Sequence, residues 1–322
     1  MRWWTCLVIL CVTVSASGGN KDNKGTKEKA QWLEVKIAQG PVRGHRHPNG
    51  ELFVFHNIPY ASAPTGKNKF MAPLPPPKWT EPYDGIDKGN IFCPQFDVGG
   101  ALPGVITKQE QCLVANVYVP DTNKKNLPVL VHVHGGAYQV AFGDWLKLTN
   151  LMNKKDIIVV NFNYRLGIHG FLCLGTEGAP GNAGMKDQVA LLQWVQQNIA
   201  AFGGSPNDVT ISGYSAGSVS VDLLMISKSA EGLFHKVIPE SGANIGAFTV
   251  QFDPIQTAKD HAKKLSFTNV DDVYALEEFY KTLPYEVLTE EERKKKKINL
   301  FSFKLQTGFW LNLTQHIPLC HV

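Results

Sequence analysis

Apolar and polar residues alternate along residues 31–58. The runs 32–37 and 52–55 each have a period of two, and Gly-Pro and Asn-Gly pairs separate such runs. This alternation is typical of strands with one buried face, and these dipeptides favour tight turns. The pattern predicts an antiparallel meander of strands.

A proline-rich stretch follows at residues 59–82 and contains three consecutive prolines at 75–77. Proline is disfavoured in helix interiors and central strands, so the stretch is predicted to be a surface loop. Aromatic residues such as Tyr60, Phe70 and Trp79 can hold this loop against a core. We therefore expect an ordered loop rather than a flexible linker between domains.

After residue 112 the pattern changes to short, continuously apolar runs separated by helical periodicity. Residues 185–202 place apolar side chains at steps of three and four, and Gly203 follows. Buried strands that alternate with helices predict a doubly wound α/β sheet, mostly parallel, with helices on both faces and ligands at the carboxyl ends of its strands. The predicted parallel strands are residues 127–133, 157–163, 209–212 and 236–239.

Two more helical patterns lie beyond residue 253, followed by a run of acidic and basic residues at 290–297. Each of the three glutamates in this run has a lysine four residues later, which is the favourable order for ion pairs on a helix. The run predicts a solvated helix rather than a nucleic-acid site.

The third parallel strand leads into Gly213, Tyr214, Ser215, Ala216 and Gly217. A serine with glycine two residues before and after it fits a nucleophile elbow, a turn so tight that larger side chains would collide with neighbouring backbone. The helix that follows directs N–H groups and the positive end of its dipole at the serine. We predict that Ser215 is an exposed nucleophile.

A second glycine-rich segment, His134-Gly135-Gly136-Ala137, follows the first parallel strand. Its N–H groups can stabilise a developing oxyanion, which lowers the barrier to acyl transfer by about 3 to 4 kcal/mol per donor. The predicted oxyanion hole consists of the N–H groups of Gly136, Ala137 and Ala216. His-Gly-Gly alone is more often an ordinary turn, but its place one crossover before the glycine-flanked serine favours hydrolase chemistry.

Composition and charge narrow the range of functions. The chain has 322 residues, and 43% of them are hydrophobic, which supports a large globular core. Its 32 basic and 28 acidic residues are nearly balanced, so no nucleic-acid partner is expected. Beyond the N-terminus, no apolar run approaches the ~18 residues that a membrane helix needs.

The N-terminus has the pattern of a secretory signal peptide. Arg2 precedes an apolar run at residues 3–14, and small residues follow at 15–19. This run is too short to span a bilayer, so we predict a signal peptide at residues 1–17 and a polar segment at 18–30. The processed chain is predicted to be secreted.

Secretion permits disulfides among the six cysteines. Cys93 and Cys112 flank a loop rich in glycine and proline, and a bridge there would stabilise the fold by roughly 3 kcal/mol. Cys173 lies in an apolar run, which favours a buried free thiol, and Cys320 has no obvious partner. The chain has no Cys-x-x-Cys spacing, and neither a metal nor another cofactor is expected.

Several segments together resemble the type B carboxylesterases, the α/β-hydrolase family that includes the cholinesterases, with a pattern similar to that of insect antennal esterases. The resemblance covers roughly residues 31–300. The motifs that carry it are Gly40-Pro41-Val42-Arg43-Gly44, Ile58-Pro59-Tyr60-Ala61, Glu110-Gln111-Cys112-Leu113, Asn163-Tyr164-Arg165-Leu166-Gly167, residues 181–188, the serine elbow and Glu240-Ser241-Gly242.

The resemblance implies an α/β-hydrolase fold and a serine hydrolase that acts on small-molecule esters through an acyl-enzyme at Ser215. It implies the same oxyanion hole and a disulfide between Cys93 and Cys112. Arg165 and Asp187 are expected to form a structural ion pair. The resemblance implies nothing about the oligomeric state.

The roles of five further residues are less specific. His134 is expected to order the oxyanion loop rather than to transfer a proton. Trp79, Tyr138 and Phe142 line a substrate pocket or belong to the core. Ser241 is a hydrogen-bond donor behind the site or an ordinary buried loop serine.

The chain departs from the family in three places. Tyr214 stands before the nucleophile, where many relatives have an acidic or amide residue, and Gln111 replaces an acid before Cys112. The catalytic glutamate and histidine of the family are not present in this chain, and its sequence no longer matches from residue 307. We therefore expect residues 31–306 to be the N-terminal part of the hydrolase domain, residues 307–322 to be an aberrant tail, and the C-terminal part of the fold to be missing.

An esterase with impaired catalysis is therefore expected. The alternative is a non-catalytic ligand-binding or interaction protein derived from an esterase. The intact elbow and oxyanion loop favour the enzyme. Five residues after the serine could be considered as substitutes for the missing partners, but none of them matches a family position: Asp222, Glu231, Asp253, His316 and His321.

Overall fold

The computed structural model describes residues 31–48, 51–85, 90–96, 106–146, 151, 156–246 and 249–294. The predicted signal peptide, the polar segment 18–30 and the tail 307–322 lie outside the described residues. The side chains of the charged run at 290–297 also lie outside them.

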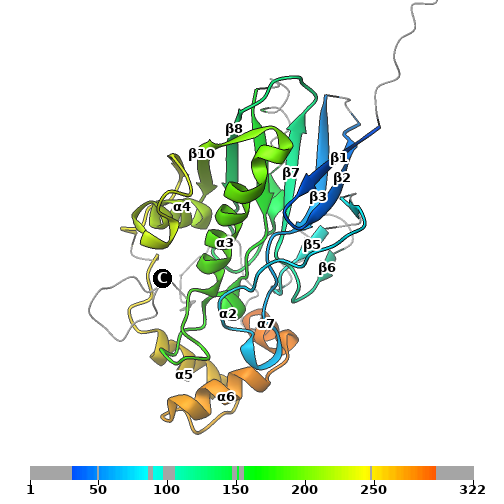
Figure 1. Cartoon of the computed structure of the whole chain (residues 1–322). Coiled ribbons are helices and arrows are strands. Elements are labelled where there is room, and N and C mark those ends of the chain that lie inside the picture. The colour runs from blue at the N-terminus through cyan, green and yellow to red at the C-terminus, as the bar shows by residue number, and fades with distance from the viewer. Residues whose placement is uncertain are drawn as a thin grey trace, which may run out of the picture. The chain divides into compact units, whose positions relative to one another are not determined.

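One mixed sheet organises the described part of the chain (Figure 1). Its strands lie in the order β1-β2-β3-β7-β9-β8-β10-β11, and β4 pairs with β2. Neighbours from β1 to β9 are antiparallel, and β9, β8, β10 and β11 are parallel to one another. The bounds are β1 Trp32–Ile37, β2 Gly40–Arg46, β3 Leu52–Pro59, β4 Tyr83–Asp84, β7 Val114–Pro120, β8 Leu127–Val133, β9 Ile158–Phe162, β10 Gly204–Tyr214 and β11 Lys236–Glu240. A separate parallel pair consists of β5 Asn90–Phe92 and β6 Ile106–Lys108.

The predicted meander is confirmed as β1, β2 and β3. In β1, Val35 and Ile37 are buried while Glu34 and Lys36 are exposed, as the alternation predicted. The pattern missed the short strands β4, β5 and β6 and also the longer strand β7, whose residues are all buried. Because β7 pairs antiparallel with both β3 and β9, the antiparallel part of the sheet extends further than the sequence predicted.

The predicted parallel strands are present as β8, β9, β10 and β11. The bounds of β8 are those predicted, whereas β10 begins earlier, at Gly204, through an irregular segment that also pairs with β8. Since the four strands run in the same direction, Val133, Tyr214 and Glu240 end β8, β10 and β11 at one edge of the sheet.

The predicted helix at 185–202 is confirmed as α3, Ala183–Asn198, continued by the 3-10 turn η3, Ile199–Phe202. Gly203 ends it with φ of 90°, a left-handed conformation that glycine adopts without steric penalty. The other bounds are α2 Gly167–Phe171, α4 Ala216–Ile226, α5 Pro254–Lys264, α6 Val273–Thr282, α7 Tyr285–Lys294, η1 Gly66–Asn68, η2 Gly143–Trp145 and η4 Lys228–Ala230. In the described ranges, no helix is long and apolar enough to cross a membrane.

Apolar side chains are buried on both faces of the sheet. Val131 and Ile211 belong to the larger core, which also contains side chains of α3 and α4. Leu130 and Val159 belong to a smaller cluster. The helices α5, α6 and α7 lie together beyond one end of the sheet (Figure 1).

The proline-rich loop at 59–82 is ordered, as predicted. Tyr60 donates a hydrogen bond from its hydroxyl to the carbonyl oxygen of Asn163 (2.7 Å). Trp79 donates from Nε1 to the carbonyl oxygen of Pro41 (2.7 Å). These two aromatic side chains tie the loop to the sheet.

Cys93 and Cys112 form the predicted disulfide, with Cα atoms 5.0 Å apart. The expectation of a free thiol at Cys173 is wrong. Cys173 is buried, as its apolar neighbours indicated, but it is disulfide-bonded. Apolar sequence neighbours report burial and carry no information about a distant cysteine.

Candidate active site

The backbone at Ser215 has the geometry of a nucleophile elbow. β10 ends at Tyr214 and α4 begins at Ala216, and Ser215 between them has φ of 55° and ψ of −120°. This conformation costs about 1–3 kcal/mol, so the surrounding structure has to impose it. The N–H of Ser215 donates to the carbonyl oxygen of Glu240 (2.9 Å), and its carbonyl accepts from the N–H of Val219 (3.1 Å).

Close backbone contacts explain the glycines of the elbow. A Cβ atom on Gly213 would overlap the carbonyl group of Gly217. A Cβ atom on Gly217 would overlap the carbonyl oxygen of Val133, at the end of β8. The spacing that identified the site in the sequence therefore reflects steric exclusion by backbone atoms.

The glycine-rich loop after β8 passes directly beside the elbow. A Cβ atom on Gly135 would lie 2.5 Å from the carbonyl oxygen of Tyr214 and 3.2 Å from the Cβ atom of Ser215. The loop adopts positive φ angles at Gly136 (103°) and Ala137 (55°). Within the described ranges, no group accepts a hydrogen bond from the N–H of Gly136 or Ala137. These N–H groups are therefore free to bind a ligand oxygen.

Ala216 supplies the third predicted donor. It is the first residue of α4, so its N–H has no acceptor within the helix and lies at the positive end of the helix dipole. The structure thus brings both segments of the predicted oxyanion hole next to Ser215.

His134 is a buried, neutral member of the oxyanion loop. Its Nδ1–H donates to the carbonyl oxygen of Gly135 (2.8 Å), and its ring stacks on Tyr164 with ring centroids 4.3 Å apart. The Tyr164 hydroxyl donates to the carbonyl oxygen of His134 (2.9 Å). Burial lowers the pKa of His134 to about 4, so the imidazole is uncharged at neutral pH. These contacts fit the expectation that His134 orders the loop.

Arg165 and Asp187 form the expected ion pair. The guanidinium donates from Nε to Oδ2 (2.8 Å) and from a terminal nitrogen to Oδ1 (2.6 Å), and both side chains are buried. Arg165 also donates to the carbonyl oxygens of Lys69 and Met71. The pair joins the segment after β9 to α3 and to the proline-rich loop, so its role is structural.

A buried polar network that the sequence did not reveal anchors the oxyanion loop. The Ser220 hydroxyl donates to the Tyr138 hydroxyl (3.1 Å), and Gln188 donates from Nε2 to Ser220 (3.1 Å). The network links the loop to α4 and α3. The only sequence signal was a pair of polar residues at buried helical positions, and such residues carry no information about their partners.

The aromatic residues that the sequence placed in a pocket or in the core have contacts that fit the core. Tyr138 and Phe142 are buried. Tyr138 packs against Phe171 and Phe142 against Phe92, with ring centroids 5.0 and 4.4 Å apart. Trp79, as described above, ties the proline-rich loop to Pro41.

Ser241 is exposed, with φ of 61°. The structure supports neither alternative, because Ser241 is not buried and its hydroxyl forms no hydrogen bond within the described ranges. Tyr214, which precedes the nucleophile, is 51% exposed at the end of β10. An aromatic ring thus stands next to Ser215 at the surface of the described structure.

No partner activates Ser215 among the described residues: no side chain there forms a hydrogen bond with its hydroxyl. Asp222 accepts a hydrogen bond from the N–H of Asn244 (2.6 Å), and Asp253 caps α5 through the N–H of Gln256 (2.9 Å). These two acids have structural roles. His316 and His321 lie outside the described residues.

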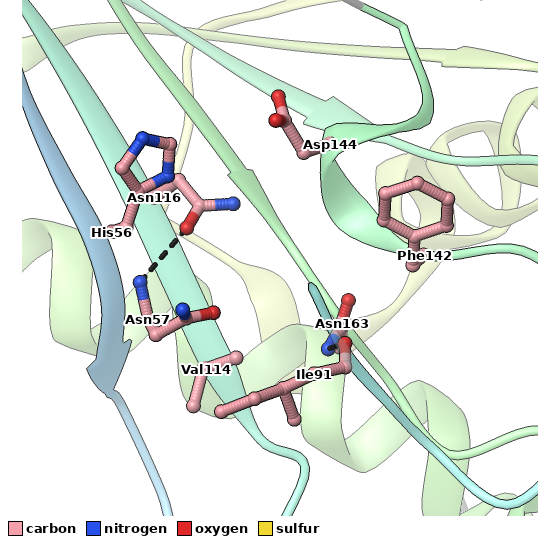
Figure 2. A pocket seen from close by; sticks show the side chains of 8 residues that line it. All are labelled: His56, Asn57, Ile91, Val114, Asn116, Phe142, Asp144 and Asn163. Carbon is pink, nitrogen blue, oxygen red and sulfur yellow. Dashed lines mark hydrogen bonds between the residues drawn. The ribbon is translucent and has the colours of Figure 1, made fainter. Parts of the chain in front are cut away.

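A small polar pocket, shown in Figure 2, is separate from the elbow. The N–H of Asn57 donates to the Asn116 side chain (2.8 Å) at its rim, and Asn161 donates to Asp144 (3.3 Å) beside it. The pocket is lined by His56, Asn57, Ile91, Val114, Asn116, Phe142, Asp144 and Asn163. Its lining comes from β3, β5, β7, η2 and the residue after β9, so it does not include the predicted catalytic residues. In the described part of the chain, no group of three or more histidine, cysteine, aspartate or glutamate residues is arranged to hold a metal ion.

Comparisons with known proteins identify several relatives of this chain. The chain is similar to Esterase B1 of Culex pipiens, with 41% identity over 225 residues that cover 68% of this chain and 41% of the relative. It is also similar to Neuroligin-2 of Mus musculus, with 33% identity over 301 residues that cover 79% of this chain and 35% of the relative. The chain thus spans less than half the length of these two relatives.

The fold is similar to a solved structure, juvenile hormone esterase from Manduca sexta with OTFP covalently attached. The two share 32% identity and a TM-score of 0.76 over 90% of this chain and 56% of that chain. This similarity confirms the predicted α/β-hydrolase fold. Residues 31–310 also match the model of the carboxylesterase family. The elbow, the glycine-rich loop, the fold and this match together show that the chain belongs to the carboxylesterase family.

Proposed function

We propose that the chain is a carboxylic ester hydrolase that acts on small-molecule esters through an acyl-enzyme at Ser215. The observation that carries the proposal is the backbone of Ser215, with φ of 55° and ψ of −120° between β10 and α4. The glycine-rich loop beside this turn supports it, because its N–H groups can serve a developing oxyanion.

The reaction uses the geometry of the elbow. Ser215 Oγ attacks the ester carbonyl carbon as a base removes its proton, and the carbonyl oxygen becomes an oxyanion. The N–H groups of Gly136, Ala137 and Ala216 donate to this oxyanion. When the tetrahedral intermediate collapses, the alcohol leaves with a proton, and water then hydrolyses the acyl-enzyme.

No described side chain bonds to the Ser215 hydroxyl, so none of them is positioned as its base in this structure. We therefore expect this chain by itself to turn over slowly. Loss of a triad member leaves about 10³- to 10⁴-fold catalysis over water, from the oxyanion hole and from binding.

A reactive p-nitrophenyl phosphonate tests the proposal on the full chain, because the attack of Ser215 on its phosphorus uses the same oxyanion donors as attack on an ester. We expect intact mass spectrometry to show one adduct, which peptide mapping places on Ser215 and which Ser215→Ala abolishes. The exposed serine of the neighbouring loop provides the matched control, so Ser241→Ala should be modified at the rate of the unaltered chain. Equal modification of Ser215→Ala would contradict the proposal.

Hydrolysis of p-nitrophenyl acetate tests the expected rate. A Ser215-dependent kcat near the ~10 s⁻¹ that is typical of enzymes would contradict impaired catalysis.

The same experiments distinguish the alternative, a non-catalytic ligand-binding or interaction protein. The lack of a described base and the similarity to a neuroligin are consistent with that alternative, which predicts no modification at Ser215.

We also propose that the protein is secreted after removal of residues 1–17. The apolar run at 3–14 and the disulfide between Cys93 and Cys112 support this location, since disulfides persist in oxidising compartments. N-terminal sequencing of the protein from the medium of expressing cells tests the proposal. A retained Met1, or absence from the medium, would contradict it.

A further inference from the structure

The carbonyl groups of three consecutive residues in the oxyanion loop are all held by hydrogen bonds. The carbonyl of His134 accepts from the Tyr164 hydroxyl (2.9 Å), and that of Gly135 accepts from the His134 ring (2.8 Å). The carbonyl of Gly136 accepts from the N–H groups of Gln139 (2.9 Å) and Val140 (3.1 Å).

These bonds determine where the N–H groups of the loop point. A peptide unit is planar, and in the trans form its C=O and N–H point in opposite directions. The described chain contains no cis peptide bond. Holding the Gly135 carbonyl therefore sets the direction of the Gly136 N–H, and holding the Gly136 carbonyl does the same for Ala137. The first of these directions depends on the imidazole of His134.

Tyr164 is the residue that holds this imidazole. Tyr164 follows β9 and is fully buried. Its ring lies 4.3 Å from the His134 ring at an interplanar angle of 18°, and its hydroxyl binds the carbonyl of the same residue. The Nε2 atom of His134 is buried and has no hydrogen-bond partner in the described structure, so beyond the Nδ1 bond the contacts on this ring are packing contacts.

We propose that Tyr164 is a positioning residue of the oxyanion loop. Tyr164 holds the imidazole of His134, and the imidazole bonds the carbonyl of Gly135. This bond orients the peptide unit whose N–H, that of Gly136, donates to the oxyanion. This inference rests on the proposed function for its catalytic consequence. The hold of Tyr164 on His134 can be tested separately from catalysis.

Two substitutions separate the two contacts. Tyr164→Phe keeps the stacked ring and removes the hydroxyl, whereas Tyr164→Leu removes both. Loss of one oxyanion donor costs about 10²- to 10³-fold in rate, and a misdirected donor costs less. We expect the first-order rate of Ser215 phosphonylation to fall about 10-fold in Tyr164→Phe and about 100-fold in Tyr164→Leu, with unchanged half-saturating phosphonate.

Tyr280 offers a matched control far along the chain. It is buried, stacks on His261 with ring centroids 5.8 Å apart, and donates its hydroxyl to the carbonyl oxygen of Ala258 (2.8 Å). Tyr280→Phe removes a bond from a tyrosine hydroxyl to a backbone carbonyl, as Tyr164→Phe does, and it also removes the contact of that hydroxyl with His261 Nδ1 (2.9 Å). Both substitutions should therefore lower the unfolding midpoint. Only the Tyr164 substitutions should slow phosphonylation.

Nitrogen-15 NMR of histidine-labelled protein gives a readout that does not require activity. At pH 7 we expect His134, assigned through His134→Asn, to carry its proton on Nδ1 alone. Tyr164→Leu should produce a mixture of the two tautomers. If Tyr164→Leu keeps the Nδ1–H tautomer, or if it is phosphonylated as fast as the Tyr280 control, the inference is wrong. If the unaltered chain shows no Ser215 adduct, the proposed function fails while the NMR result still decides whether Tyr164 holds His134.

Discussion

Backbone carbonyl groups lie so close to the elbow that a single added Cβ atom on Gly213 or Gly217 would overlap one of them. The site that a Cβ atom would occupy on Gly217 is filled by the carbonyl oxygen of Val133, at the end of a neighbouring strand. Backbone atoms of a central strand cannot move aside as a flexible side chain can. At the scale of the residue, glycine is therefore required at positions 213 and 217 because neighbouring backbone atoms leave no room for a Cβ atom.

Gly217→Ala should consequently destabilise the fold by about 1–3 kcal/mol through overpacking. It should also slow modification of Ser215, since the elbow has to shift. Gly232→Ala is the matched control, because Gly232 has φ of 76° but no atom lies within 4 Å of the added Cβ. That control should lose only the ~1–2 kcal/mol of left-handed strain and keep the rate of modification. The measurements are urea unfolding and phosphonylation, and an equal rate in both variants would contradict the steric explanation.

At the scale of the element, buried contacts between segments distant in the sequence fix how strands and helices join. The Arg165–Asp187 pair connects the segment after β9, the first turns of α3 and the proline-rich loop. Hydrophobic periodicity predicted both ends of β8 correctly, and it predicted the start of α3 to within two residues. It could do so because each pattern lies within one short stretch of the chain. It missed β7, because this buried strand lacks apolar–polar alternation and the buried side chain of Asn116 interrupts its apolar run.

Asp187→Ala should destabilise the fold by about 3–5 kcal/mol, because it leaves the Arg165 guanidinium buried without its counter-charge. The surface pair of Lys236 and Asp208 is the control, with side chains 61% and 40% exposed. Asp208→Ala should cost no more than about 1 kcal/mol. Urea unfolding of both variants measures the difference. If Asp187→Ala and Asp208→Ala lower the free energy of unfolding by similar amounts, the buried pair does not stabilise the fold more than the surface pair does.

At the scale of the whole molecule, buried neutral histidines make stability depend on pH. Burial lowers the pKa of His134 to about 4, and burial with the nearby charges of Lys69 and Arg165 lowers the pKa of His169 to about 3. Burial also lowers the pKa of His132. The unfolded chain therefore binds more protons than the fold below the ordinary pKa of histidine, about 6.5.

The stability contributed by these neutral histidines is complete above pH 6.5 and is lost as the pH falls towards 4 and 3. In that window the free energy of unfolding should fall by about 1.4 kcal/mol per pH unit for each such histidine. Urea unfolding between pH 7 and pH 4.5 measures this slope. His169→Phe, which fits the aromatic surroundings of Phe70 and Tyr285, should reduce it. A flat profile, or an unchanged slope in His169→Phe, would contradict the assignment.

The sequence by itself indicated the carboxylesterase family, the meander and the parallel strands after residue 112. It could do so because glycine spacing and hydrophobic periodicity can be recognised within a short stretch of the chain. Only the tertiary structure decided that Tyr164 holds His134, that Ser220 joins the oxyanion loop to two helices, and that Cys173 is disulfide-bonded. These contacts join residues that lie far apart in the chain, and their partners are set by the way strands and helices pack.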